Sequence, residues 1–391
     1  MSDVSGIEKI TDRAGTGAPD FTNGFNINGS DSGISGFAHT ESASEPSSPS
    51  NGDAWLDTDN NVYKVYIDGE WKDWLGTSPS TSNPWSGDRG VFAGGDESNG
   101  ITDRIQYIDI TTPGNSTDFG DLTQSTRYGA GASSTARGLH IGGYPSSSPT
   151  NVIAYVTIST PGDAVDFGNL AAAAYYNTAC SDGTRAFSFG GYNNNTGTVM
   201  NNIQQIVIAT TGNATDVGDI SIPSYYGAAC SDATRAVTAV GRTREAATSG
   251  NFTYVNNMEY ITTASAGNST DFGDTTLARG QFAACSDSTR GLFAAGYGTF
   301  TNNRTDTIDY ITIQTTGNAT DFGDLSQNNI RLSSCANATR GIFGGGYTTT
   351  GSTGRVNTIE YVTIQTPGNA TDFGDLAAVN YGLAAFSGNA S

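Results

Sequence analysis

The segments Gly317-Asn-Ala-Thr-Asp-Phe-Gly-Asp-Leu325 and Arg340-Gly-Ile-Phe-Gly-Gly-Gly346 decide the fold, because versions of both recur along the chain. The first, the hallmark segment, begins at Gly114, Gly162, Gly212, Gly267, Gly317 and Gly368. The second begins at Arg89, Arg137, Arg185, Arg235, Arg290 and Arg340. Self-similarity at a period of about 50 residues indicates a repeat architecture, and each repeat here carries four short strand-like segments.

The spacing of these segments predicts how the repeats are joined. Each of the first five hallmark glycines precedes the next leading arginine by 23 residues, whereas 25 to 32 residues separate an arginine from the following glycine. The chain ends 23 residues after Gly368, so a spare strand over Tyr381 to Phe386 is left for the first repeat, which has no strand of its own before Arg89. We expect these to pair and close a six-bladed β-propeller over residues 88–391, which leaves no exposed sheet edge.

Composition narrows the class of protein. The chain has 51 glycines, 14% charged residues and a net charge of −20, and this favours an all-β fold with many turns. No lysine follows Lys72, so we expect no nucleic-acid partner, which would need clustered basic residues. No apolar stretch is long enough for membrane insertion, and the first residues do not read as a signal peptide.

The four cysteines occupy one position of successive repeats and are expected to be free, buried thiols. Cys180, Cys230, Cys285 and Cys335 align with Ala132 and Phe386, and a position that accepts Cys, Ala or Phe belongs to a core. No cofactor is predicted from these or other residues.

The first 87 residues differ in composition from the rest, since they hold all four tryptophans. We expect an extended segment over 1–46, a small β meander over 47–76 and a Ser/Pro-rich linker over 77–87. One such small sheet is marginal alone, so it should pack on a partner or on another copy of the chain.

Two resemblances can be stated on these residues. The strand ending in Gly-Gly and the following Tyr-bearing strand resemble the kelch repeat, although phenylalanine or valine stands where kelch repeats carry tryptophan. The hallmark with Ala-Ala-Cys-Ser-Asp-x-Thr-Arg resembles repeats of structural proteins from tailed phages of cyanobacteria. Ala14 to Gly24 and the Gly52-Asp-Ala-Trp to Asp68-Gly-Glu-Trp element resemble parts of phage tail-fibre proteins.

The resemblance implies a virion protein, assembled in the host cytoplasm, that attaches to other virion proteins through residues 1–87. The same residues are a candidate homo-oligomer interface. The propeller is expected to bind a host-surface receptor or glycan. Two alternatives stay open: a connector or capsid/tail decoration that binds another virion protein, and a glycan depolymerase using non-repeated acids such as Glu97, Glu245 and Asp306.

Neither histidine indicates an enzyme. His140 replaces a phenylalanine of other repeats, which favours a core role, and no nucleophile and base stand out from the repeat background, so no catalytic activity is predicted. The paired hallmark acids, such as Asp321 and Asp324, could contribute to a cation site but are expected to bond backbone N–H groups in turns. The Asn-x-Ser/Thr triplets, such as that at Asn369, are assigned no function.

The variable loops after each leading strand are the predicted binding surface, because they mix rigid aromatics with adaptable polar groups. In a kelch-type blade they share a face with the joint before each innermost strand, which includes Arg279 and Arg331. The predicted ligand-binding residues are Arg242, Arg244, Phe252, Tyr254, Tyr175, Tyr225, Tyr297, Arg304, Tyr347 and Arg355.

Overall fold

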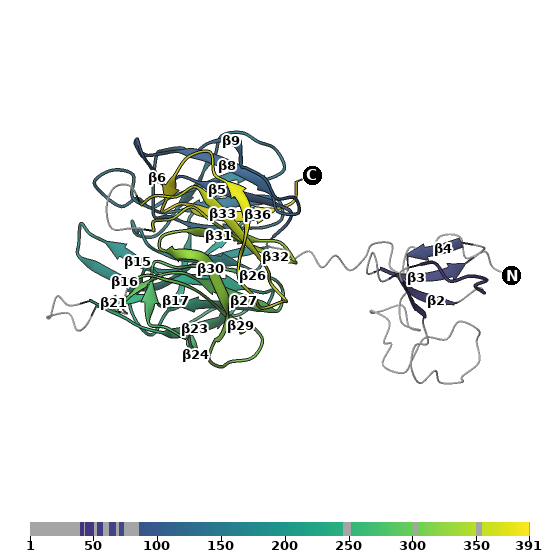
Figure 1. Cartoon of the computed structure of the whole chain (residues 1–391). Helices are drawn as coiled ribbons and strands as arrows, with labels where there is room; N and C mark the ends of the chain where they lie inside the picture. The colour runs from purple at the N-terminus through teal and green to yellow at the C-terminus, as the bar shows by residue number, and fades with distance from the viewer. Residues whose placement is uncertain are drawn as a thin grey trace. The chain divides into compact units, whose positions relative to one another are not determined.

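The computed structural model describes residues 40–42, 44–50, 53–57, 62–67, 70–73, 86–244, 252–299, 303–348 and 354–390. The chain divides into two compact units, Met1–Thr81 and Ser82–Ser391. Every regular element of the described residues is a β-strand, so the predicted all-β class is confirmed (Figure 1). Most of the expected segment over 1–46 and of the linker over 77–87 lies outside the described residues.

The small unit contains one four-stranded sheet. Strands β2 (Ala54–Asp57), β3 (Val62–Ile67) and β4 (Glu70–Asp73) form the predicted antiparallel meander, and β1 (Thr40–Ser42) pairs in parallel with β2. Trp55 is buried and its ring lies 5.5 Å from that of Trp71, while its indole N–H donates to the Ser42 carbonyl at 3.0 Å. Strand β1 was not predicted from the sequence.

The large unit contains six four-stranded antiparallel sheets, each with the order expected for one repeat. The strands are β36 (Ala384–Gly388), β5 (Arg89–Ala93), β8 (Arg104–Asp109) and β9 (Thr117–Asp121); β10 (Ala130–Ser133), β11 (Arg137–Ile141), β12 (Val152–Thr157) and β13 (Val165–Asn169); β14 (Thr178–Ser181), β15 (Arg185–Asn193), β16 (Thr198–Val207) and β17 (Thr215–Asp219); β19 (Ala228–Ser231), β20 (Arg235–Ala239), β23 (Asn257–Thr262) and β24 (Thr270–Asp274); β26 (Ala283–Ser286), β27 (Arg290–Ala294), β29 (Thr305–Thr312) and β30 (Thr320–Asn329); and β31 (Ser333–Ala336), β32 (Arg340–Gly344), β33 (Thr358–Thr363) and β34 (Thr371–Asp375).

Short strands extend three of the repeats near their variable loops. They are β6 (Asp96–Glu97), β7 (Gly100–Ile101) and β35 (Asn380–Tyr381); β18 (Ser224–Tyr225), β21 (Arg242–Arg244) and β22 (Phe252–Tyr254); and β25 (Arg279–Gly280) and β28 (Tyr297–Gly298). Each set joins a variable loop to the segment that precedes an inner strand.

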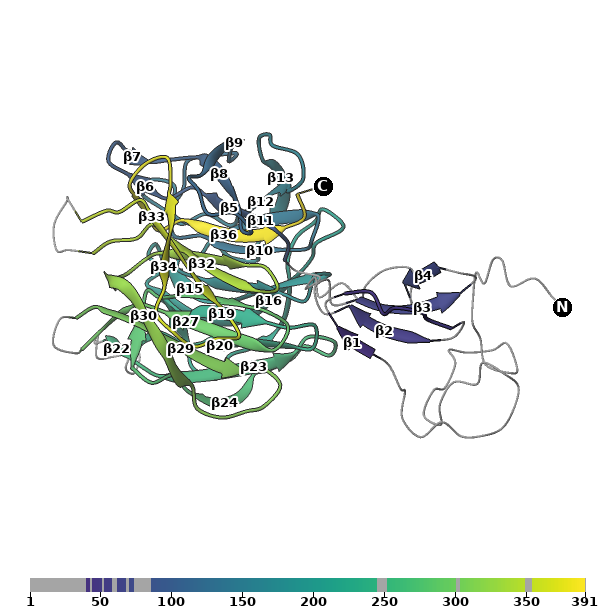
Figure 2. The ribbon, with the colours of Figure 1, turned by 45° about the vertical axis from the view of Figure 1, so that its right-hand side comes forward.

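The C-terminal strand pairs with the first repeat, as predicted. Strand β36 runs antiparallel to β5, with Ala384 opposite Ala93 and Gly388 opposite Arg89 (Figure 2). The first strands of the six sheets, here called the inner strands, are neighbours in the cyclic order β10, β14, β19, β26, β31, β36 and back to β10. The two ends of the large unit are therefore joined through strand pairing and inner-strand contacts.

The core is built between neighbouring sheets rather than inside one central mass. One cluster joins Leu292 and Phe322 of one repeat to Phe343 and Val362 of the next. The cysteines are free and buried, which confirms their predicted core position. The Cys230 sulfur lies where a Cβ on Gly291 would come within 2.4 Å, so glycine on the next leading strand makes room for it.

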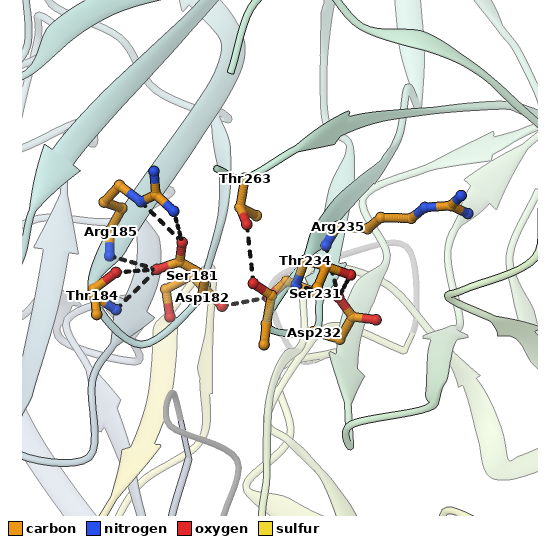
Figure 3. A network of polar contacts seen from close by, with 10 residues as sticks. Ser181, Asp182, Thr184, Arg185, Ser231, Asp232, Thr234, Arg235 and Thr263 are labelled. Atoms are coloured by element: carbon orange, nitrogen blue, oxygen red, sulfur yellow. Dashed lines mark hydrogen bonds and ion pairs between the residues drawn. The ribbon is translucent and has the colours of Figure 1, made fainter. Parts of the chain in front are cut away.

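A repeated turn precedes the leading arginines Arg185, Arg235, Arg290 and Arg340. The Asp182 carboxylate accepts bonds from the backbone N–H groups of Thr184 and Arg185 at 2.9 and 2.7 Å, and Asp232 repeats this with Thr234 and Arg235 (Figure 3). These Asx turns satisfy the N–H groups that enter the leading strand. The hydrogen bonds lower the pKa of Asp182 against the opposing effect of burial.

Candidate functional site

A ring of six residues, here called the αL ring, surrounds one end of the inner strands. Its members occupy the same position of each repeat and have φ between 56° and 69°: Tyr128, Tyr176, Tyr226, Gln281, Arg331 and Gly382. Each backbone N–H donates to the carbonyl of the preceding member at 2.7 to 3.1 Å, and Tyr128 donates to Gly382, so the series returns to its start. Five side chains other than glycine accept this unfavourable left-handed conformation because the ring bonds hold them there.

The αL ring frames a central pocket of about 130 Å³. Below the ring, the pocket walls are small residues of the inner strands, among them Ala130, Ala179 and Ala229. A second hollow of about 70 Å³ lies at the other end of these strands. Polar backbone and side-chain atoms of the αL ring line the mouth of the pocket, and the walls are formed by small side chains.

The opposite end of the inner strands carries a serine ring, defined by Ser133, Ser181, Ser231, Ser286, Ala336 and Ser387. The hydroxyl of each serine donates to the carbonyl of the preceding member, as Ser231 does to Ser181 and Ser286 does to Ser231, both at 2.7 Å. Ala336 has no hydroxyl, so the link to Ser286 is missing, although the Ala336 carbonyl still accepts from Ser387 at 2.5 Å.

An aromatic belt surrounds the αL ring. It consists of Tyr144, Tyr175, Tyr192, Tyr225, Phe252, Tyr254, Tyr297, Tyr347 and Tyr381. Successive rings lie 4.8 to 5.8 Å apart in the Tyr144–Tyr175, Tyr175–Tyr192, Tyr192–Tyr225 and Tyr225–Phe252 pairs. The belt and the αL ring are in direct contact, since Tyr175 lies 4.6 Å from Tyr176 and Tyr225 lies 4.7 Å from Tyr226.

All ten predicted ligand-binding residues belong to this belt or to the arginines within it. Tyr225 is buried, Arg244 is exposed, and the other eight are partly exposed. Tyr175 pairs with Tyr192 through an isolated bridge, as Tyr297 does with Arg304 and Tyr347 with Arg355. The predicted residues thus come from three variable loops and from the segments before two inner strands.

Arginines fill the gaps in the belt. The Arg242 guanidinium lies 4.6 Å from the Phe252 ring and 5.4 Å from the Tyr254 ring, and it links β21 to β22. Arg304 lies 5.1 Å from Tyr347, and Arg355 lies 5.1 Å from Tyr381. These cation–π contacts hold the guanidinium groups over aromatic faces while part of each side chain stays in solvent.

Asp96 links the first repeat to the C-terminal segment of the large unit. Its buried carboxylate accepts from Arg127, from Arg355 at 2.9 Å and from the Tyr381 hydroxyl at 3.1 Å. The ligand predictions omitted Asp96, Arg127 and Tyr381, as well as Tyr144 and Tyr192. The aromatic residue that recurs at the start of the variable loops could have indicated Tyr144 and Tyr192, whereas no feature of the sequence singles out Asp96.

Arg279 does not belong to the binding face, contrary to the expectation. Its side chain is fully buried and donates to the Asp309 carboxylate at 2.8 Å and to the Phe293 carbonyl at 3.1 Å. Arg331 does lie at the pocket mouth, two positions later in its own repeat. The two arginines differ because Arg279 occupies the place of Asn329, whose side chain also points inward to bond the Gly345 carbonyl.

The second residue of the hallmark segment, which is asparagine in five repeats and Asp163 in one, makes the repeated contact, rather than the paired aspartates that follow it. The side-chain oxygen at this position accepts a backbone N–H from the outer strand of the preceding repeat at 3.0 to 3.1 Å, and the acceptors are Asn115, Asp163, Asn213, Asn268, Asn318 and Asn369. The triplets that were assigned no function therefore link neighbouring sheets. Among the hallmark aspartates, a backbone bond of the expected kind is found from Gly218 to Asp216, at 3.2 Å.

The histidines and the non-repeated acids were the other residues considered for catalysis. His140 is buried, as expected for a core role, and burial lowers its pKa to about 4. Glu97 is paired with Arg104 at 3.0 Å. Glu245 and His39 lie outside the described residues.

Within the described ranges, no three His, Cys, Asp or Glu side chains are grouped as ligands for a metal ion. In the same part of the chain there is no helix long and apolar enough to cross a membrane. No protein-family model matches this sequence, and no curated protein is significantly similar to it.

Proposed function

We propose that residues 88–391 form a six-bladed β-propeller that serves as the recognition module of a phage virion appendage and binds a host-surface receptor, a glycan in particular. The propeller assignment is supported by six equivalent four-stranded sheets, by the cyclic order of their inner strands, and by the αL ring of backbone hydrogen bonds. Pairing of β36 with β5 supplies the strand that the first repeat lacks.

The aromatic belt is the observation that carries the recognition function. Tyrosine faces and arginine side chains are the groups that most often dominate binding energy, and tyrosine offers large contact area at low cost in conformational entropy. Sugar rings present apolar C–H faces and many hydroxyl groups, which such a belt can stack against and hydrogen bond. The belt surrounds the central pocket, so one ligand can contact the belt and enter the pocket at the same time.

The virion assignment rests on the resemblance of the repeats and of the N-terminal elements to phage structural proteins. Residues 1–87 then attach the module to other virion proteins or to further copies of the chain. Particles assembled with a chain limited to residues 88–391 should lack it, as measured by mass spectrometry of purified virions. Normal incorporation of that shortened chain would reject the attachment role.

A double substitution at the belt tests the recognition function. Arg244→Ala with Tyr254→Ala should weaken adsorption to host cells by about tenfold, because two anchors are removed from the longest variable loop. Thermal unfolding should remain cooperative. Val207→Ala is a matched surface control, since Val207 is 51% exposed and lies opposite Arg185 at the other end of β16.

Host adsorption that is unchanged by the double substitution, with copy number per particle also unchanged, would reject the belt as the receptor site. Loss of the protein from the particle with normal folding would instead favour the alternative of a connector or decoration protein, because the belt would then be contacting another virion protein.

A further inference from the structure

Arg331 stands at the mouth of the central pocket with one side of its guanidinium group uncommitted. Its Nε donates to Gln281 Oε1 at 2.7 Å and its Nη1 donates to the Tyr128 hydroxyl at 3.2 Å. Within the described part of the chain, its Nη2 donates no hydrogen bond. The guanidinium also lies 5.4 Å from the Tyr128 ring and 5.6 Å from the Tyr381 ring. It is therefore held in place by neutral groups.

The charge of Arg331 is not neutralised by a nearby acid. No carboxylate of the described residues lies within 4.0 Å of Arg331 or Arg304 as a salt-bridge partner. Arg304 is close enough to feel the like charge of Arg331, and burial together with this repulsion lowers its pKa. Asp96 already serves Arg127 and Arg355. The mouth thus concentrates positive charge in a chain whose net charge is −20.

The tyrosines around Arg331 can act as donors to an anion. Burial raises the pKa of Tyr128 and of Tyr176 well above the usual value, so both hydroxyls stay protonated at neutral pH. The Tyr128 hydroxyl accepts a bond from Arg331, and a phenol can accept one hydrogen bond while it donates another. An anionic group at this place would meet a guanidinium nitrogen and a phenol together, which are charge-assisted donors.

We propose that the central pocket binds an acidic saccharide, with a carboxylate or sulfate group of the sugar paired to Arg331 and its ring against the surrounding tyrosines. This inference rests on the proposed recognition function and specifies its ligand class. Arg304 adds to the attraction without needing direct contact. The negative charge of the rest of the protein repels an anion elsewhere, so the mouth is the place where an acidic ligand is favoured.

The test is isothermal titration calorimetry of the full chain with matched pairs of probes. Trigalacturonate is compared with its fully methyl-esterified, uncharged form, and neocarrabiose 4-sulfate with its desulfated form. Inorganic phosphate is a third arm that distinguishes a bare anion from an acidic sugar. The better acidic probe should bind at least about tenfold tighter than its neutral partner, and this preference should shrink at 1 M salt because screening weakens the ion pair.

Arg331→Gln should abolish the preference for the acidic probe. The substitution suits the backbone, because Gln281 occupies the same position of another repeat with φ 61°. Arg104→Gln is the control, since it removes the same unit of charge from an arginine already paired with Glu97. Arg304→Gln, expected to reduce the preference by about threefold, keeps the test valid if Arg331→Gln unfolds.

Equal binding of acidic and neutral probes, or an acidic preference that survives Arg331→Gln in folded protein, would overturn the inference while leaving saccharide recognition standing. Binding of phosphate as tight as that of the acidic sugars would also overturn it, since the saccharide would then contribute nothing. Failure of all probes to bind would reject the ligand class, whereas the host-adsorption experiment judges the recognition function separately.

Discussion

Each end of the inner strands carries a ring of hydrogen bonds between neighbouring repeats, but the donor groups differ between the two ends. At the tyrosine end, the αL ring is made of backbone N–H and carbonyl groups, and its side chains vary among Tyr, Gln, Arg and Gly. At the other end, the ring bonds are donated by side-chain hydroxyls, and five of the six positions are serine. Where the backbone carries the links, the side chains are free to vary; where side chains carry them, their identity is restricted.

The strongest way to break this comparison is to remove residues 381–391. The deletion takes Gly382 from the αL ring, Ser387 from the serine ring and β36 from its pairing with β5. We expect loss of the cooperative thermal transition, equivalent to about 5 kcal/mol or more, which is comparable to the whole stability of a domain. Calorimetry provides the measurement, and removal of residues 390–391 alone, beyond the last strand, should leave the transition intact.

The packing behind the tyrosine end should make the stability of the fold depend on pH through His140. Burial lowers the pKa of His140 from 6.5 to about 4 in the folded protein, so the unfolded chain binds its proton more readily between these values. Stability contributed by neutral His140 is present above pH 6.5 and is lost as the pH falls toward 4, by about 3 kcal/mol in total.

His140→Phe should remove that part of the pH dependence, because Phe92 and Phe293 occupy the equivalent position in other repeats. The measurement is the difference in unfolding free energy between wild type and variant from pH 7 to pH 4, by urea denaturation. Other acidic groups titrate equally in both proteins. A difference that does not change with pH would contradict the buried, neutral state of His140.

The serine end can be sharpened by a pair of opposite substitutions. Ala336→Ser should stabilise the fold by about 1 kcal/mol, because the new hydroxyl can donate to the Ser286 carbonyl and complete the ring. Ser231→Ala should destabilise it by a similar amount through loss of the 2.7 Å bond to the Ser181 carbonyl. The measurement is the denaturation midpoint of each variant relative to wild type. If both substitutions shift the midpoint in the same direction, the cooperative ring is rejected.

The smallest effect on stability is expected at the rim of the tyrosine end. Arg244 is exposed and donates one bond to the Gly197 carbonyl at 3.2 Å, so Arg244→Ala should change the unfolding free energy by less than about 0.5 kcal/mol. The same variant should measurably reduce host adsorption. A large loss of stability would show that the variable loop supports the fold, against the division of labour between the two ends.

The repeats could be predicted from the sequence because each unit has the same strands and turns and therefore needs similar residues at the same spacing. The constant spacing from the hallmark glycine to the next arginine predicted the six sheets, and the position of the last hallmark Gly368 predicted the pairing of the C-terminal strand. Glycine, hydrophobic alternation and turn residues act over a few neighbours along the chain, so their effect is visible in the order of residues.

Only the tertiary structure decided which side chains meet. The burial of Arg279 against Asp309, and the position of Arg331 at the pocket mouth, depend on a difference of two places in equivalent segments. The role of Asp96 depends on residues more than 250 positions away, at Tyr381 and Arg355. Sequence determined the repeating framework through local spacing, whereas the candidate site arises from contacts among different repeats, which the cyclic order of the inner strands brings together.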